Sequence, residues 1–124
     1  MATSLSAGLF IREMLGNANI PGVTKIFPVA TDTAQLPYIS YRRVSLDPQA
    51  WKGGNADMVG VEVLCYASTY EQSLTIAEAV RAALDCMQAS IGALVLRSCL
   101  LVDSEEMWSD DAYVQRLVFN LKIA

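Results

Sequence analysis

The sequence predicts an α+β domain: a mostly antiparallel sheet of about four to five strands, one long helix packed across it and a short N-terminal helix. Residues 58–66 and 113–123 alternate between apolar and polar side chains, as strands with one buried face do. Residues 70–88 carry apolar side chains at spacings of three and four, as a helix with one buried stripe does. With 124 residues, 53% of them apolar and 18% charged, we expect a single domain spanning residues 1–124.

The N-terminal part predicts a helix and two strands. Residues 5–15 approximate a helical stripe, with Thr3 and Ser4 as capping candidates and Gly16-Asn17 as the stop signal. Residues 23–27 read as a brief strand ended by Pro28. Residues 38–44 mix aromatic, β-branched and polar side chains, which predicts a half-exposed strand near an edge. Residues 30–35 and 45–56 are predicted loops.

The C-terminal part predicts a strand, the long helix and a hairpin. Val61 and Val63 lie on the inner face of strand 58–66, and Glu62 on the other. Ser68 and Glu71 have the S-x-x-E spacing of a capping box, so the helix should begin there and extend about 28 Å. Strands 94–102 and 113–123 should pair antiparallel across an acidic loop at 103–111.

Charge and cysteine content narrow the function classes. The net charge of −4 disfavours tight nucleic-acid binding. The longest apolar runs are too short for a membrane span, and the N-terminus lacks the positive region of a signal peptide, so we expect no membrane partner. Cys65, Cys86 and Cys99 are widely spaced and are interpreted as reduced core residues in a cytosolic setting.

Catalysis is not expected. The chain has no histidine, which removes the usual general base and the commonest metal ligand. Serine-nucleophile, phosphate-loop, paired-cysteine and dinucleotide patterns are also absent from the sequence. We predict no catalytic residues, no cofactor and no metal, with an enzyme that uses carboxylates alone as the minor alternative.

The acidic segment is the densest cluster of charge. We interpret it as a solvated hairpin loop, with an ion site or a charged contact surface as alternatives, because it lacks the ordered D-x-D-x-D-G pattern of a calcium loop. Met107 and Trp108 within it are costly to leave wet unless they fold back or meet a partner. The acidic residues are Asp103, Glu105, Glu106, Asp110 and Asp111.

Three further residues are interface candidates. Trp51 lies in the predicted loop 45–56, where it either folds back onto its own domain or contacts a partner. Arg42 and Arg43 could bind phosphate or pair with the acidic segment of a neighbouring copy. Because adjacent strand residues point to opposite faces, the two arginines should not form one basic patch.

Three segments, in their order and spacing, resemble the phage tail-completion (tail-terminator, or tail-to-head joining) family. They are LPYISYRRVS, VEVLCYASTYEQSLTIAEAVRAALD and DAYVQRLVFNLKI, and the similarity spans nearly the whole chain. The resemblance implies a structural virion or prophage protein that forms a homo-oligomeric ring, commonly a hexamer, at the end of the tail tube. Such a ring terminates tail assembly, joins the tail to head–tail connector proteins, and lets DNA pass through its channel.

The same resemblance implies contacts with the tail tube protein and, for localisation, the host cytoplasm during assembly and then the virion. It carries over no catalytic residues. A small-molecule-binding regulatory α+β domain that acts as an oligomer is the alternative, because a sheet with two helices can also form ligand sites between subunits.

Overall fold

The computed structural model describes residues 3–23, 25–29, 35–48, 56–109 and 111–124. It has one six-stranded sheet in the order β1-β2-β3-β6-β5-β4. β1 is parallel to β2 and every other neighbouring pair is antiparallel. The strands are β1 (Ile26–Pro28), β2 (Tyr38–Asp47), β3 (Asp57–Ala67), β4 (Ala89–Ile91), β5 (Leu94–Ser109) and β6 (Ala112–Ile123).

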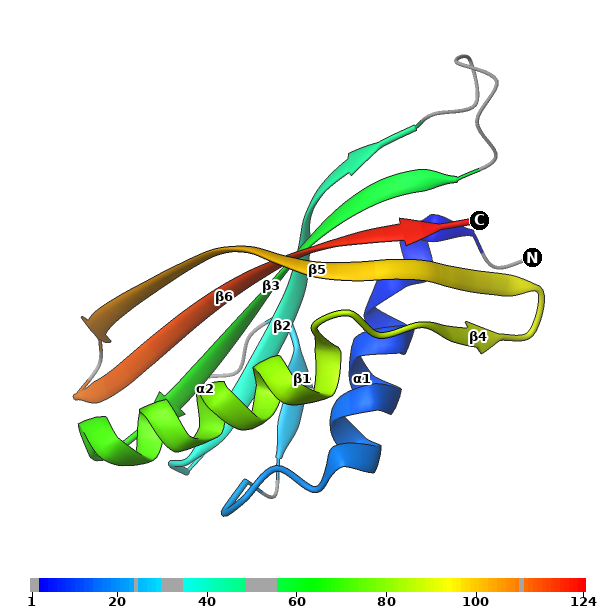
Figure 1. Ribbon diagram of the computed structural model, residues 1–124. Helices are drawn as coiled ribbons and strands as arrows, with labels where there is room; N and C mark the ends of the chain where they lie inside the picture. The colour runs from blue at the N-terminus through cyan, green and yellow to red at the C-terminus, as the bar shows by residue number, and fades with distance from the viewer. Residues whose placement is uncertain (1–2, 24, 30–34, 49–55, 110) are drawn as a thin grey trace.

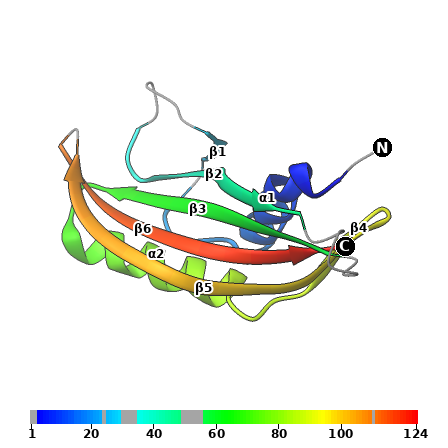
Figure 2. The ribbon, with the colours of Figure 1, turned by 90° about the horizontal axis from the view of Figure 1, so that it is seen from above.

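Two helices lie on one face of this sheet. A 3-10 turn (Ser4–Ser6) leads into α1 (Ala7–Ala18), and α2 (Tyr70–Leu84) connects β3 to β4 (Figure 1). The long strands β3, β6 and β5 bend together, so the sheet curves like part of a barrel (Figure 2). One apolar core joins both helices to the inner face of the sheet, with Phe10, Ile76 and Phe119 fully buried in it.

The predicted fold class is wrong in three respects. The sheet is mixed and has six strands, where four to five mostly antiparallel strands were predicted. Two short helices share its face, where one long helix across the sheet and a short N-terminal helix were predicted. β4 was not predicted, because a strand of three residues shows no periodicity by which the sequence could reveal it, whereas β1 overlaps the brief strand predicted at residues 23–27.

α2 begins at Tyr70, as predicted, but its capping residue and its C-terminal end differ from the prediction. The N-cap is Thr69, whose hydroxyl accepts a hydrogen bond from Gln72 N at 3.2 Å, so Ser68 does not cap the helix. The helix ends at Leu84 because Asp85 is extended and Cys86 has φ of 64°, a left-handed conformation that an α-helix cannot continue through. The 15-residue helix therefore spans about 22 Å.

The N-terminal helix follows its prediction in outline. Thr3 caps the 3-10 turn by accepting from Leu5 N, and the helix ends at Asn19 in the left-handed region, two residues beyond the predicted stop at Gly16-Asn17. Its buried side chains are Ala7, Phe10, Ile11 and Leu15. Leu5 and Leu9, which were predicted to belong to the buried stripe, are exposed.

Candidate interface residues on the sheet face and the hairpin arm

The two faces of the sheet differ in what covers them. Val59, Val61, Val63 and Cys65 of β3 point toward the helices and are fully buried. Glu62 and its even-numbered neighbours point to the opposite face, which the described helices do not cover. We call this second surface the helix-free face.

A line of charges crosses the helix-free face over four strands. Arg42 of β2 donates from Nε to Glu62 Oε1 of β3 at 3.0 Å, and Arg116 of β6 donates from Nε to Glu62 Oε2 at 2.6 Å. Arg116 also lies 3.9 Å from Asp103 of β5. The strand register places Glu105 directly opposite Arg116. We call these five residues the charge ladder.

Glu62 is the centre of the ladder, with only 6% of its surface exposed. Burial is the largest single influence on its pKa and raises it, but hydrogen bonds and charges from Arg116 and Arg42 together outweigh burial and lower the pKa. Glu62 is therefore a carboxylate held ionised between two guanidinium groups. Such an arrangement fixes side-chain geometry across β2, β3 and β6 and offers no proton for chemistry near neutral pH.

The acidic segment is not a loop. Residues 103–109 continue β5 and pair with β6, from Asp103 opposite Val118 to Ser109 opposite Ala112. A register shift between Leu101 and Asp103 reverses which residues face the helices. Asp103, Glu105 and Met107 thus share the helix-free face, whereas Glu106 and Trp108 lie on the helix side. We call residues 103–115 the hairpin arm, and Figure 1 shows it beside the start of α2.

Glu106 ties the hairpin arm to α2. Its Oε2 accepts hydrogen bonds from the Tyr70 hydroxyl at 2.6 Å and from Gln115 Nε2 at 2.9 Å. Gln115 Nε2 also donates to the buried Ser73 hydroxyl at 3.2 Å. The hydrogen bond from Tyr70 is the main reason that the pKa of Glu106 is lowered, and the same bond raises the pKa of Tyr70.

Three aromatic rings surround this contact. Tyr113 packs edge-to-face against Tyr70, with ring centroids 5.9 Å apart, and against Trp108, with centroids 4.9 Å apart. Trp108 nevertheless keeps 58% of its surface exposed. It therefore folds back only in part and still presents a large apolar surface to a partner. Met107 is half-buried on the opposite face.

Arg42 and Arg43 lie on opposite faces, as strand alternation predicted. Arg43 Nη1 donates to the backbone oxygen of Leu5 at 2.8 Å, on the helix side. Both arginines border a hollow of about 360 Å³ at the end of β1, and its other lining residues are Leu5, Gly8, Pro28, Val29 and Tyr41. Val29 is exposed there and has φ of 67°, in the left-handed region.

Comparison with known proteins gives the family. The family model described as "Tail completion protein gp17" matches residues 11–124 of the chain. The chain belongs to the tail completion protein gp17 family. It is a structural tail protein by that membership, as the sequence segments predicted. No curated protein sequence matches the chain.

A solved structure has the same fold. It is a chain of the "Virion of native gene transfer agent (GTA) particle", with a TM-score of 0.68 and 16% sequence identity. The match covers 97% of this chain and 88% of that one. At this identity the similarity concerns the fold alone, and it covers nearly the whole of the present chain.

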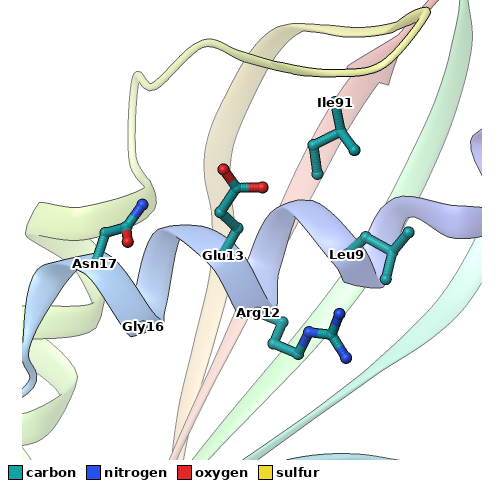
Figure 3. A pocket seen from close by; sticks show the side chains of 6 residues that line it. All are labelled: Leu9, Arg12, Glu13, Gly16, Asn17 and Ile91. Carbon is teal, nitrogen blue, oxygen red and sulfur yellow. The ribbon is translucent and has the colours of Figure 1, made fainter.

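A second hollow, of about 330 Å³, lies between α1 and β4 and is lined by Leu9, Arg12, Glu13, Gly16, Asn17 and Ile91. In Figure 3, Glu13 and Arg12 extend from opposite sides of α1, so their charges do not converge on one point. A small-molecule site needs convergent polar groups in a concave pocket. The hollow gives no support to the ligand-binding alternative.

Trp51 and Asp110 lie outside the described residues. Asp111 is exposed at the tip of the hairpin arm, with φ of 60°. Within the described ranges, no three histidine, cysteine or acidic side chains are grouped so that they could hold a metal ion. Of the helices that the structure describes, none is both long and apolar enough to span a bilayer.

Sequence reasoning missed several of the contacts that organise these surfaces. Arg116 and Glu62 each lie on the polar face of an alternating strand, and the sequence did not show that they form an ion pair. Tyr70 was assigned to the buried helical stripe, yet it is exposed and bonds to Glu106. Gln115 carried no signal, because a buried amide in an alternating strand is visible only once its partner is known.

Proposed function

We propose that this tail completion protein forms a closed ring at the end of a phage tail tube, where it terminates tail assembly and joins the tail to the head. The ring is a homo-oligomer of six copies in this proposal. One of its faces contacts the tail tube protein and the other contacts head–tail connector proteins. The chain is made in the host cytoplasm and becomes part of the virion or of a prophage-derived particle.

The observation that carries this proposal is the family match over residues 11–124, which names tail completion as the role of the family. The fold of a gene transfer agent virion chain supports the same context, because the match covers 97% of this chain. Both agree with a domain whose exposed features are charged and aromatic surfaces suited to protein contacts. The role proposed is therefore architectural, without catalysis, cofactor or membrane contact.

DNA passes through the ring without being bound in this proposal. The chain carries nine basic and thirteen acidic residues, so its net charge of −4 disfavours adhesion to phosphates. Like charges at a channel wall suppress sticking of a passing strand. Arg116 is engaged with Glu62, which further reduces the cationic groups available to DNA.

Inactivation of the gene in a particle-producing strain tests the function. We expect tails that are abnormal in length or that fail to join heads, and a plasmid copy of the gene should restore both properties. Electron micrographs of purified particles give the tail-length distribution and the fraction of tails joined to heads. Tails of normal length that join heads normally without the gene would show that tail completion is not its function.

A further inference from the structure

We propose that neighbouring copies join edge to edge, with the free edge of β2 in one copy pairing with the free edge of the hairpin arm in a second copy. This inference rests on the proposed ring and specifies the surfaces that build it. Arg42 and Arg43 form the basic side of the contact. Asp103, Glu105 and Glu106 form the acidic side.

Beyond Tyr41, none of the strands that the structure describes pairs with β2 on the β1 side. β1 pairs only with Ile39–Tyr41, and the last backbone hydrogen bond on this side runs from Val29 N to Tyr41 O at 2.6 Å. The N–H and C=O groups of every second residue point to the same edge of a strand. Those of Arg43 therefore point to the same side as those of Ile39 and Tyr41, where β1 has ended. No described strand pairs with residues 42–46 on that side. The hollow bordered by Arg43 and Val29 lies on this side of β2, beside the end of β1.

The hairpin arm has the second open edge. Up to Leu101, the outer edge of β5 is covered: β4 pairs with residues 94–96, Cys86 N donates to Cys99 O at 2.7 Å, and Leu101 N donates to the Asp85 carboxylate at 2.9 Å. From Asp103 to Ser109, no described strand pairs with that edge. The β2 segment of five residues extends roughly 17 Å and the arm segment of seven residues roughly 24 Å, so the shorter segment can pair along its whole length with the longer one.

In this pairing, opposite charges meet on both faces of the joined sheet. When the two sheets continue into one another, Arg42 on the helix-free face meets Asp103 and Glu105, while Arg43 on the helix side meets Glu106. Opposite charges across paired strands stabilise them, and like charges destabilise them. If two arms paired with each other, acidic side chains would face acidic side chains, and if two β2 edges paired, arginines would face arginines. Repulsion between like charges therefore disfavours pairing of identical edges.

The two edges lie at opposite sides of the strand order, which determines the assembly. A contact between two different patches repeats by rotation and builds a ring when that rotation closes, or an open filament when it does not, whereas a contact of one patch with itself stops at a dimer. Trp108, exposed beside the arm edge, then lies near the hollow at the β2 edge of the next copy, where Val29 and Leu5 are exposed apolar neighbours. One pairing thus supplies the head-to-tail contact that the proposed ring needs and covers these apolar residues.

Charge reversal tests the pairing in the producing strain that lacks the gene. Arg43→Glu and Glu106→Lys each place like charges across every contact, and each should lower the fraction of head-joined, normal-length tails at least about tenfold. Co-expression of the two variants should restore that fraction. In a ring in which the two variants alternate, the reversed β2 edge of one variant meets the reversed arm edge of the other. At the next contact, the parental β2 edge meets the parental arm edge. Both contacts therefore join opposite charges. The double variant on one chain should be restored for the same reason.

Matched controls carry the same charge changes away from both edges: Arg12→Glu on α1 and Glu78→Lys on α2, both at exposed positions. They should behave as the parent chain. Purified Arg43 variants and both controls should unfold within about 5 °C of the parent, whereas Glu106→Lys also loses the hydrogen bonds from Tyr70 and Gln115 and should unfold at a lower temperature. Arg43→Gln and Glu106→Gln, which retain polarity, should show a smaller defect in the same direction, and they decide the question if a reversal variant fails to fold.

The outcomes separate the two proposals. If the parent gene does not restore normal tails, the proposed function is wrong. If the parent gene restores them and folded Arg43 and Glu106 variants also do so alone, the edge pairing is wrong. The pairing is wrong as well if the single variants fail but their co-expression does not rescue, since a contact between the two named edges requires that rescue.

Discussion

On the helix-covered face of the sheet, Val61, Val63 and Phe119 are buried against two helices, whereas on the helix-free face Arg42, Glu62 and Arg116 form the charge ladder across the same strands. The first face is stabilised by removing apolar surface from water. The second is stabilised by hydrogen-bonded ion pairs around one buried carboxylate. The difference shows how one alternating sequence builds a core and leaves the opposite face polar.

The largest effect should come from the core face. Phe119→Ala removes a fully buried ring and should lower the free energy of unfolding by about 3–5 kcal/mol. Val118→Ala, one residue away on the helix-free face, should cost less than about 1.5 kcal/mol because Val118 is only half-buried. Urea unfolding of both variants measures the comparison, and equal losses would mean that the two faces do not differ as described.

An intermediate effect should come from the centre of the charge ladder. Glu62→Gln leaves two guanidinium groups without their shared carboxylate and should lower the free energy of unfolding by about 1–3 kcal/mol. Glu105→Gln is the matched control, because Glu105 is exposed, and should change it by no more than about 0.5 kcal/mol.

The same variant gives a pH test. Because the pKa of Glu62 is lowered in the folded chain, its contribution to stability is complete above the unfolded carboxyl value of 4.5 and is lost as pH falls through the folded pKa. The parent chain should therefore lose more stability than Glu62→Gln on acidification from about pH 6 to about pH 3. If the two proteins lost equal stability on acidification, Glu62 would not be a source of the pH dependence.

The smallest effect, without a change in stability, should be seen in thiol labelling. Burial raises the pKa of both Cys65 and Cys99 to about 12, and Cys86 is exposed, which corrects its assignment to the core. An alkylating reagent should label Cys86 quickly in the native chain and the other two only after unfolding. Cys86→Ser should abolish the fast reaction. Fast native labelling that persists in this variant would contradict the burial of Cys65 and Cys99.

Most of the sheet was predictable where one face is buried, because alternation then has a fixed register. Val61 and Val63 of β3 and Phe119 of β6 were placed correctly for this reason. The outer half of β5 was not predictable. Its charged side chains contact Arg116 on one face of the sheet and Tyr70 on the other, so no apolar alternation marks it as a strand.

The interface candidates were predictable as residues but not as an arrangement. Asp103 and Glu106 were chosen for their charge, yet the register shift after Leu101 decides which face each one joins. Arg42 was correctly separated from Arg43, since period-two alternation alone determines that. The partners Glu62 and Arg116 are 54 residues apart, and their contact depends on the pairing of β3 with β6.

The position of this chain on purified tails tests the central claim most directly. We would attach a short C-terminal epitope tag, confirm that the tagged gene restores head joining, and locate the tag with gold-labelled antibody on tails isolated before head attachment. The account predicts label at one end of each tail, with averaged images showing a closed ring there. Label distributed along the tube, or absent from tails that are competent to join heads, would contradict it.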